Sequence, residues 1–167
     1  MAVVLIAAAT LAGCGITDTD VNPAGQPVQG GLTADSSQLL RVYFVTQEGI
    51  WAVSRPAPAG NRLQRAMDAL LQGPTAEERA RGLGTQVPSA PRPVRATTSG
   101  GRVELRLPWQ VRNLRPVAVS QLVCTAAAAG GDAPVIEVVE PGTSQPWPVR
   151  CDGNGSAVPV GDQGAFR

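Results

Sequence analysis

Residues 61–75, NRLQRAMDALLQGPT, carry the pattern that decides the fold of this chain. Asn61 is suited to cap the start of a helix, and Gly73-Pro74 is suited to end it. Apolar side chains between these signals recur at helical spacing, at Leu63, Ala66, Met67, Leu70 and Leu71. The stretch therefore predicts a helix with one face in a hydrophobic core.

The residues before this helix alternate between apolar and polar side chains. Residues 39–56, LLRVYFVTQEGIWAVSRP, place Leu40, Val42 and Phe44 on one face and turn at Glu48-Gly49. Alternation over this length, broken by a turn, is typical of two half-buried strands. The segment predicts a β-hairpin that ends at the proline of residue 56.

A second hairpin and a second helix follow. Residues 94–110, VRATTSGGRVELRLPWQ, alternate in the same way and turn at Ser99-Gly100-Gly101. Residues 115–131 have Pro116 in a first helical turn and a closing Gly130-Gly131. The expected stripe of this helix is Val119, Leu122, Val123 and Ala126.

Two further strands complete the predicted fold. They are residues 135–142, VIEVVEPG, and residues 145–153, QPWPVRCDG. Pro146 and Pro148 favour an edge position for the last strand, because proline donates no ladder hydrogen bond. The order ββαββαββ predicts an α+β class, with two helices packed on one face of a largely antiparallel sheet.

The composition narrows the chemistry of the chain. Its 167 residues include 14 basic residues, all arginine, and 13 acidic residues, so the net charge of +1 does not indicate nucleic-acid binding. The absence of His excludes Ser-His-Asp and Cys-His pairs and His-bearing zinc sites. From this composition we expect no catalytic residue, no metal site and no cofactor.

A short helical turn is predicted after the first helix, because Thr75-Ala76-Glu77-Glu78 has the form of a capping box.

The first 14 residues, MAVVLIAAATLAGC, have the pattern of a secretory signal. The apolar run is too short for a membrane span, which needs about 20 residues. Leu11-Ala12-Gly13-Cys14 resembles a bacterial lipobox, in which the cysteine receives a diacylglycerol and the chain is cut before it. The run lacks the basic start of a signal peptide, so either the true start lies upstream or residues 1–14 form a buried element with a core cysteine.

Residues 15–37, GITDTDVNPAGQPVQGGLTADSS, have the composition of a flexible tether. The expected organisation is a signal peptide at 1–13, a tether at 14–37, a folded domain at 38–153 and a tail at 154–167. We expect lipid on Cys14 to hold the protein on the extracytoplasmic face of the cell membrane.

A Gly-Pro turn and a glycine-rich loop connect the first helix to the second hairpin. The residues of this pattern are Ala69-Leu-Leu-Gln-Gly-Pro-Thr75, Glu78, Gly82, Gly84-Thr85 and Val87-Pro88. With the strand VELRLP and the helical Gln121-Leu-Val-Cys-Thr125, the pattern resembles the GerMN domain of sporulation and germination proteins, across about residues 38–153. The same domain occurs in LpqB-type lipoproteins, where a large further domain follows it. The resemblance implies a non-catalytic assembly or interaction module with a protein partner in the bacterial envelope.

The chain has three cysteines. If Cys14 carries lipid, Cys124 and Cys151 are the two that can pair or stay free. Outside the cytoplasm, two such thiols usually pair. Cys151 shares a strand face with Trp147, whereas Cys124 lies about 100° around the helix from Val123, away from the stripe centre. Two interpretations stay open: a disulfide between Cys124 and Cys151, or two free buried thiols.

Four side chains are candidates for a contact surface: Trp51, Trp109, Arg102 and Arg106. Tryptophan anchors interfaces, although each tryptophan also fits a core position. The main hypothesis is a lipid-anchored envelope protein that docks another envelope protein. The alternative is a lipoprotein that binds a small ligand or a cell-wall glycan, and an enzyme that uses a free thiol is a third reading. No feature requires self-association, so the oligomeric state stays open.

Overall fold

The computed structural model describes residues 38–90, 92–131 and 135–161. The predicted signal peptide and tether lie outside the described residues. The elements in chain order are β1 (Leu39–Val45), β2 (Ile50–Pro56), α1 (Arg62–Gln72), α2 (Ala76–Ala80), β3 (Arg95–Ser99), β4 (Arg102–Arg106), a 3-10 helix (Val111–Asn113), α3 (Pro116–Ala129), β5 (Ile136–Val139), β6 (Trp147–Cys151) and β7 (Ala157–Pro159). The α+β class and the predicted order of elements are confirmed, and β7 adds a strand in the segment predicted as a tail.

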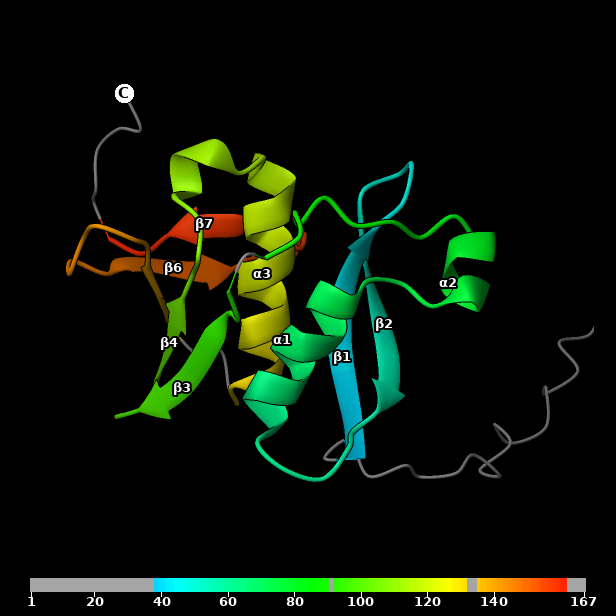
Figure 1. Cartoon of the computed structure of the whole chain (residues 1–167), viewed down its shortest axis with the longest axis horizontal. Helices are drawn as coiled ribbons and strands as arrows, with labels where there is room; N and C mark the ends of the chain where they lie inside the picture. Colours follow the sequence, from blue (N-terminus) through cyan, green and yellow to red (C-terminus); the bar gives the residue numbers. More distant parts are fainter. Residues whose placement is uncertain (1–37, 91, 132–134, 162–167) are drawn as a thin grey trace, which may run out of the picture. The chain divides into compact units, whose positions relative to one another are not determined.

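The described strands form two sheets, a division that the alternating pattern does not encode. β1 and β2 form an antiparallel pair, and the other sheet has the order β3-β4-β5-β6-β7. All neighbours in the larger sheet are antiparallel except β4 and β5. That pair is parallel because α3 carries the chain back across the sheet, as a parallel connection requires. Figure 1 shows α1 and α3 between the two sheets, where the sequence predicted helices on one face of a single sheet.

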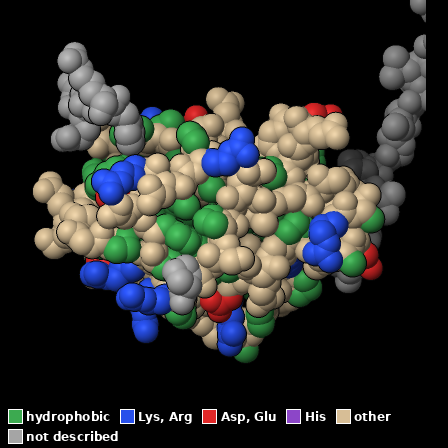
Figure 2. All heavy atoms as spheres, turned by 45° about the horizontal axis from the view of Figure 1, so that its top comes forward, with side chains coloured by type: hydrophobic (Ala, Val, Ile, Leu, Met, Phe, Trp, Pro, Cys, Tyr) green, Lys and Arg blue, Asp and Glu red, His purple; other side chains and the backbone are tan. Residues whose placement is uncertain are grey.

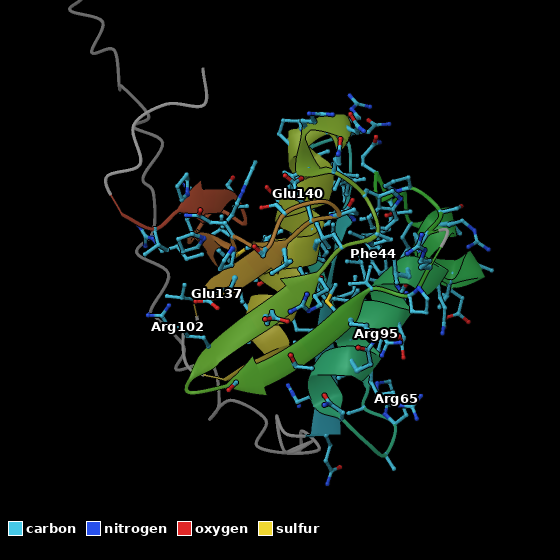
Figure 3. All side chains as sticks on the ribbon, turned by 60° about the vertical axis from the view of Figure 1, so that its left-hand side comes forward. Phe44, Arg65, Arg95, Arg102, Glu137 and Glu140 are labelled. Carbon is cyan, nitrogen blue, oxygen red and sulfur yellow. A yellow bond between two sulfur atoms is a disulfide. The ribbon has the colours of Figure 1, made fainter. Side chains whose placement is uncertain are left out.

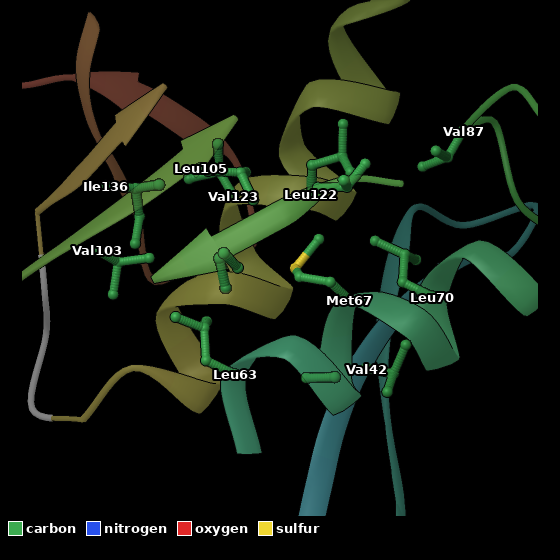
Figure 4. Close-up of a cluster of buried hydrophobic side chains, with 14 of the residues drawn as sticks. Val42, Leu63, Met67, Leu70, Val87, Val103, Leu105, Leu122, Val123 and Ile136 are labelled. Carbon is green, nitrogen blue, oxygen red and sulfur yellow. The ribbon is translucent and has the colours of Figure 1, made fainter. Parts of the chain in front are cut away.

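α1 confirms the expected amphipathic helix. Asn61 accepts a hydrogen bond at its side chain from the backbone N–H of Gln64, at 3.1 Å, and so caps the helix. Its buried residues are Leu63, Ala66, Met67 and Leu70. These side chains join one cluster that reaches from β1 to β5 (Figure 4).

α3 differs from the expected helix because it is buried on more than one side. Every residue from Ser120 to Ala126 is buried, including the polar Ser120, Gln121 and Thr125. A helix between two sheets has no wide solvent face, so a single apolar stripe underestimates its burial. The predicted Leu122, Val123 and Ala126 are buried, but they are only part of the buried set.

β6 is an inner strand, so the predicted edge position of the last proline-containing strand is wrong. β6 pairs with β5 on one side and with β7 on the other. Pro148 lies where the β6–β7 ladder ends, and its carbonyl accepts a hydrogen bond from Val160 N at 2.9 Å. Its missing N–H therefore affects only the end of the ladder.

Candidate interaction site

Arg55 of β2 connects the small sheet to the end of α1. Its guanidinium lies 4.9 Å from the centre of the Phe44 ring and donates to the carbonyl oxygens of Ala69, at 3.3 Å, and Gly73, at 3.0 Å. The same guanidinium forms a two-pronged ion pair with Glu78, with Nε 3.1 Å from Oε1 and Nη2 bonded to Oε2. One arginine thus fixes the position of β2 against α1 and α2.

Glu78 is the acidic side of this cluster and is 4% exposed. Its carboxylate accepts from the backbone N–H of Thr75 at 2.8 Å, and the Thr75 hydroxyl accepts from the Glu78 N–H at 3.2 Å. The predicted capping box of α2 is therefore confirmed. The hydrogen bond from Arg55 holds the pKa of Glu78 below its ordinary value, despite the opposing effect of burial.

α3 occupies the outer edge of β1 with polar side chains. Gln121 donates from Nε2 to the Tyr43 carbonyl at 2.9 Å, and Thr125 Oγ1 accepts from the Tyr43 N–H at 3.0 Å. Gln121 Oε1 also accepts from the Gln86 N–H at 2.8 Å. Further along the same edge, Val45 and Gly84 exchange two backbone hydrogen bonds. Side chains and a loop thus replace a neighbouring strand at this edge.

The two edges of the larger sheet receive similar partners. At β3, Gln64 of α1 accepts from the Ala96 N–H at 3.0 Å and donates to the Val94 carbonyl at 2.9 Å. At β7, the Ser120 hydroxyl of α3 accepts from the Ala157 N–H at 3.0 Å. In the described part of the chain, no buried side-chain nitrogen or oxygen lacks a hydrogen-bond partner. The polar groups of the interior are therefore committed to holding the fold.

At the outer edge of β2, the described residues supply no such partners. Thr46 N bonds to Gly49 O, and Ala57 N bonds to Gln38 O. In an antiparallel pair such bonds involve every second residue, so the odd-numbered residues of β2 bond to β1. The N–H and C=O groups of the even-numbered residues of β2 therefore point away from β1. Among the described residues, nothing bonds to the outward groups of Ala52 and Ser54. Trp51 precedes Ala52 in β2. It is a large hydrophobic side chain, and it is 61% exposed in the described structure.

The four predicted contact residues do not form one surface. Trp51 lies on the two-stranded sheet, and Trp109 is partly buried against the core. Arg102 pairs with Glu137 at 2.6 Å, as Figure 3 shows, and Arg106 pairs with Glu104 at 2.6 Å, both on the outer face of the larger sheet. Arginine side chains are spread over the face seen in Figure 2 rather than gathered in one patch. The structure therefore leaves Trp51 as the predicted residue beside an open backbone edge.

The two cysteines of the folded part form a disulfide. Cys124 of α3 and Cys151 of β6 are bonded, with their Cα atoms 4.9 Å apart. Of the two interpretations left open by the sequence, the structure has the disulfide, and it joins the central helix to an inner strand. The predicted lipobox, Leu11 to Gly13, and the predicted lipidation site, Cys14, lie outside the described residues.

The sequence analysis missed the residues that organise the site from within. Arg55, Gln64 and Gln121 have no sequence motif that announces their contacts. A signal was present for Gln121, because it is a polar residue in a largely apolar helix, and such residues need partners when buried. Arg55 lies on a strand face with Val53, and its partners come from residues 69–78.

These features define a class: a small α+β domain with a hydrogen-bonded interior and one strand edge left open. The chain belongs to the Germane family, described as sporulation and spore germination, whose model matches residues 41–138, more than half of the chain. The match confirms the expected resemblance to the sporulation and germination domain. No curated protein and no solved structure matches the chain.

Two searches of the described residues complete the survey. No helix among them is both long enough and apolar enough to cross a membrane. No group of three or more Cys, Asp or Glu side chains in this part of the chain is placed to hold a metal ion. Asp152 instead organises its own turn, where its side chain accepts from the N–H groups of Asn154, at 2.9 Å, and Ser156, at 2.8 Å.

Proposed function

We propose that this protein is a lipid-anchored component of the cell envelope whose Germane domain works by binding protein, without catalysing a reaction. The family description supports a role related to sporulation or germination. The sequence Leu11-Ala12-Gly13-Cys14, which resembles a lipobox, supports the anchor, and the composition of residues 15–37 supports a tether between the anchor and the domain.

The open edge of β2 carries the binding role. Exposed backbone donors and acceptors on a strand form a template for pairing with another chain, and an exposed tryptophan supplies apolar contact area beside them. The polar groups inside the domain are engaged in its own hydrogen bonds, and both cysteines of the fold are in a disulfide. These features favour contact with a partner over chemistry at a pocket.

The anchor is tested by the mass of the protein extracted from membranes. We expect a chain that begins at Cys14 and carries the added mass of acyl chains. The variant Cys14→Ala should be released from the membrane or stall before cleavage, whereas Cys124→Ala, which removes a cysteine of the fold, should still carry lipid. An unmodified protein dissolved inside cells would contradict the anchor.

The binding role is tested by crosslinking in intact cells. We expect a reproducible protein adduct that Trp51→Ala reduces and that Gln72→Ala, an exposed change on α1, leaves unchanged. Retention on cell-wall glycan that is lost with Trp51→Ala, and no protein adduct, would instead support the alternative of a glycan-binding lipoprotein.

A further inference from the structure

The β6–β7 hairpin, residues 147–159, has a thin side-chain attachment to the rest of the domain. It follows residues 41–138, which match the family model, and it lies beside α3 (Figure 1). Every residue of the hairpin is described, and only the side chain of Val149 is buried, whereas three of the four residues of β5 are buried. Trp147, Cys151 and Ala157 pack partly against the core. Little apolar surface therefore holds the hairpin in place.

The disulfide between Cys124 and Cys151 pins this hairpin to α3. Cys151 is the last residue of β6, and Val149 lies two residues before it, so the bond limits how far β6 can move. The hydroxyl of Ser120 adds a hydrogen bond from Ala157 N, at 3.0 Å. Residues 140–146, which join β5 to the hairpin, are largely exposed and can act as a hinge. A covalent bond is thus a main attachment of a segment that is otherwise able to swing away.

The hairpin covers the edge of β5. The backbone N–H of Leu107 donates to the carbonyl of Val139, so the odd-numbered residues of β5 bond toward β4. The N–H groups of Ile136 and Val138 therefore point toward β6, which pairs with β5 at both positions. If the hairpin moves away, β5 becomes an edge strand with two uncovered donors.

We propose that the Cys124–Cys151 disulfide is a redox-controlled lock, whose reduction frees the β6–β7 hairpin and bares the edge of β5 while the rest of the domain stays folded. The inference is independent of the lipid anchor and of the β2 edge. It makes access to an inner strand depend on the redox state of one bond.

The reducing step needs a dithiol. Cys151 is partly exposed and Cys124 is 1% exposed, so the sulfur of Cys151 is the one that a reductant reaches. A thiolate of the reductant attacks this sulfur, the bond to Cys124 breaks, and the Cys124 sulfur leaves as a thiolate that takes up a proton. The second thiol of the reductant then displaces Cys151 as a thiol. The protein gains two electrons and two protons, and the reductant becomes a disulfide.

Hydrogen exchange resolved to single amides tests the release in the full chain. We expect dithiothreitol to raise the exchange rates of Ile136 and Val138 about tenfold or more, because their N–H groups lose β6. The matched controls are Glu137 and Val139 in the same strand, whose N–H groups point toward β4 and should change less than about twofold. The double variant Cys124→Ala/Cys151→Ala should show the same alternation without reductant.

Trypsin cleavage measures the same release at the hairpin itself. Arg150 lies in β6 and Arg106 lies in β4, and both are exposed. After reduction, cleavage after Arg150 should become about tenfold faster, whereas cleavage after Arg106 should keep its rate, because β4 stays paired on both sides.

The outcomes are distinct. Faster exchange at Ile136 and Val138 alone in β5, together with faster cleavage after Arg150, supports the proposal. An equal rise at Glu137 and Val139, or throughout α1, would mean that the bond holds the whole fold, and would overturn it. The absence of either selective change also overturns it, as does a disulfide that dithiothreitol fails to break in the folded protein, which the mass of the alkylated chain reports.

Discussion

The two edges of the small sheet show opposite solutions to the same problem. At β1, Gln121 and Thr125 of α3 bond to both backbone groups of Tyr43, and Gly84 bonds to Val45. At β2, the outward groups of Ala52 have no such partners among the described residues. An edge that is closed by side chains belongs to the fold, whereas an edge that is left open is available for binding. Stability should therefore depend on the contacts inside β1 and β2, and binding on the outside of β2.

The largest effect is expected where β2 is fixed from the inside. Glu78→Ala leaves the buried guanidinium of Arg55 without its carboxylate and removes half of the capping box, so we expect a loss of about 4 kcal/mol in the free energy of unfolding. Glu77→Ala, one residue away and exposed, should change it by less than about 1 kcal/mol. Urea unfolding monitored by circular dichroism measures both variants. Equal effects at the two positions would contradict the role of the ion pair.

The disulfide should come next. Cys124 and Cys151 are 27 residues apart, and the chain-entropy model gives about 3.5 kcal/mol for a loop of this length. The double variant Cys124→Ala/Cys151→Ala should lose close to that amount in urea unfolding. Reduction of the unmodified protein should lower the unfolding midpoint in the same direction, and a midpoint unaffected by reductant would contradict a stabilising bond.

Gln121 tests the closed edge directly. Gln121→Leu keeps the apolar bulk of the side chain but leaves the Tyr43 carbonyl and the Gln86 N–H without their partner, which should cost about 2–3 kcal/mol. Gln72→Leu makes the same chemical change at an exposed position and should cost less than about 0.5 kcal/mol. If Gln121→Leu proves neutral, the side chains of α3 do not close this edge, and the contrast with β2 loses its basis.

How far the sequence predicts this molecule depends on how each element is buried. α1 packs along one face, so its spacing revealed Leu63, Met67 and Leu70 without any knowledge of the neighbours. α3 is surrounded, and its polar residues are placed by strands far away in the sequence, so no local pattern could reveal the contact of Gln121 with Tyr43. The spacing of apolar residues predicts which side of a helix is buried, but it does not predict which residues will contact that side.

The candidate site follows the same rule. The sequence predicts Trp51 as a contact residue from its type alone. Its exposure depends on which strands pair, and among the described strands β2 pairs only with β1, which only the tertiary structure decides. Arg102 and Arg106 are candidates because the sequence predicts that they line one solvated face of a single sheet. They belong to another sheet, since the division into two sheets depends on long-range pairing.

Acid should weaken the inner attachment of β2. The pKa of Glu78 is lowered in the folded state, mainly by the hydrogen bond from Arg55, so its stabilising contribution is fully present above the ordinary value of 4.5 and is lost as the pH falls through the folded value. The stability difference between the unmodified protein and Glu78→Gln should therefore narrow as the pH falls below 4.5. Urea midpoints at a series of pH values measure it, and a difference that stays constant to low pH would contradict the lowered pKa.

The smallest effect is expected on the outer face of the larger sheet. Arg102 pairs with Glu137, but the arginine side chain is 62% exposed, and solvent screens pairs of this kind. Arg102→Ala should change the free energy of unfolding by less than about 0.5 kcal/mol and leave unchanged the protein adduct formed by crosslinking in intact cells. Because Arg102 belongs to the other sheet, a loss of that adduct would mean that binding extends beyond one strand edge. The binding surface would then include the outer face of the larger sheet as well as the edge of β2.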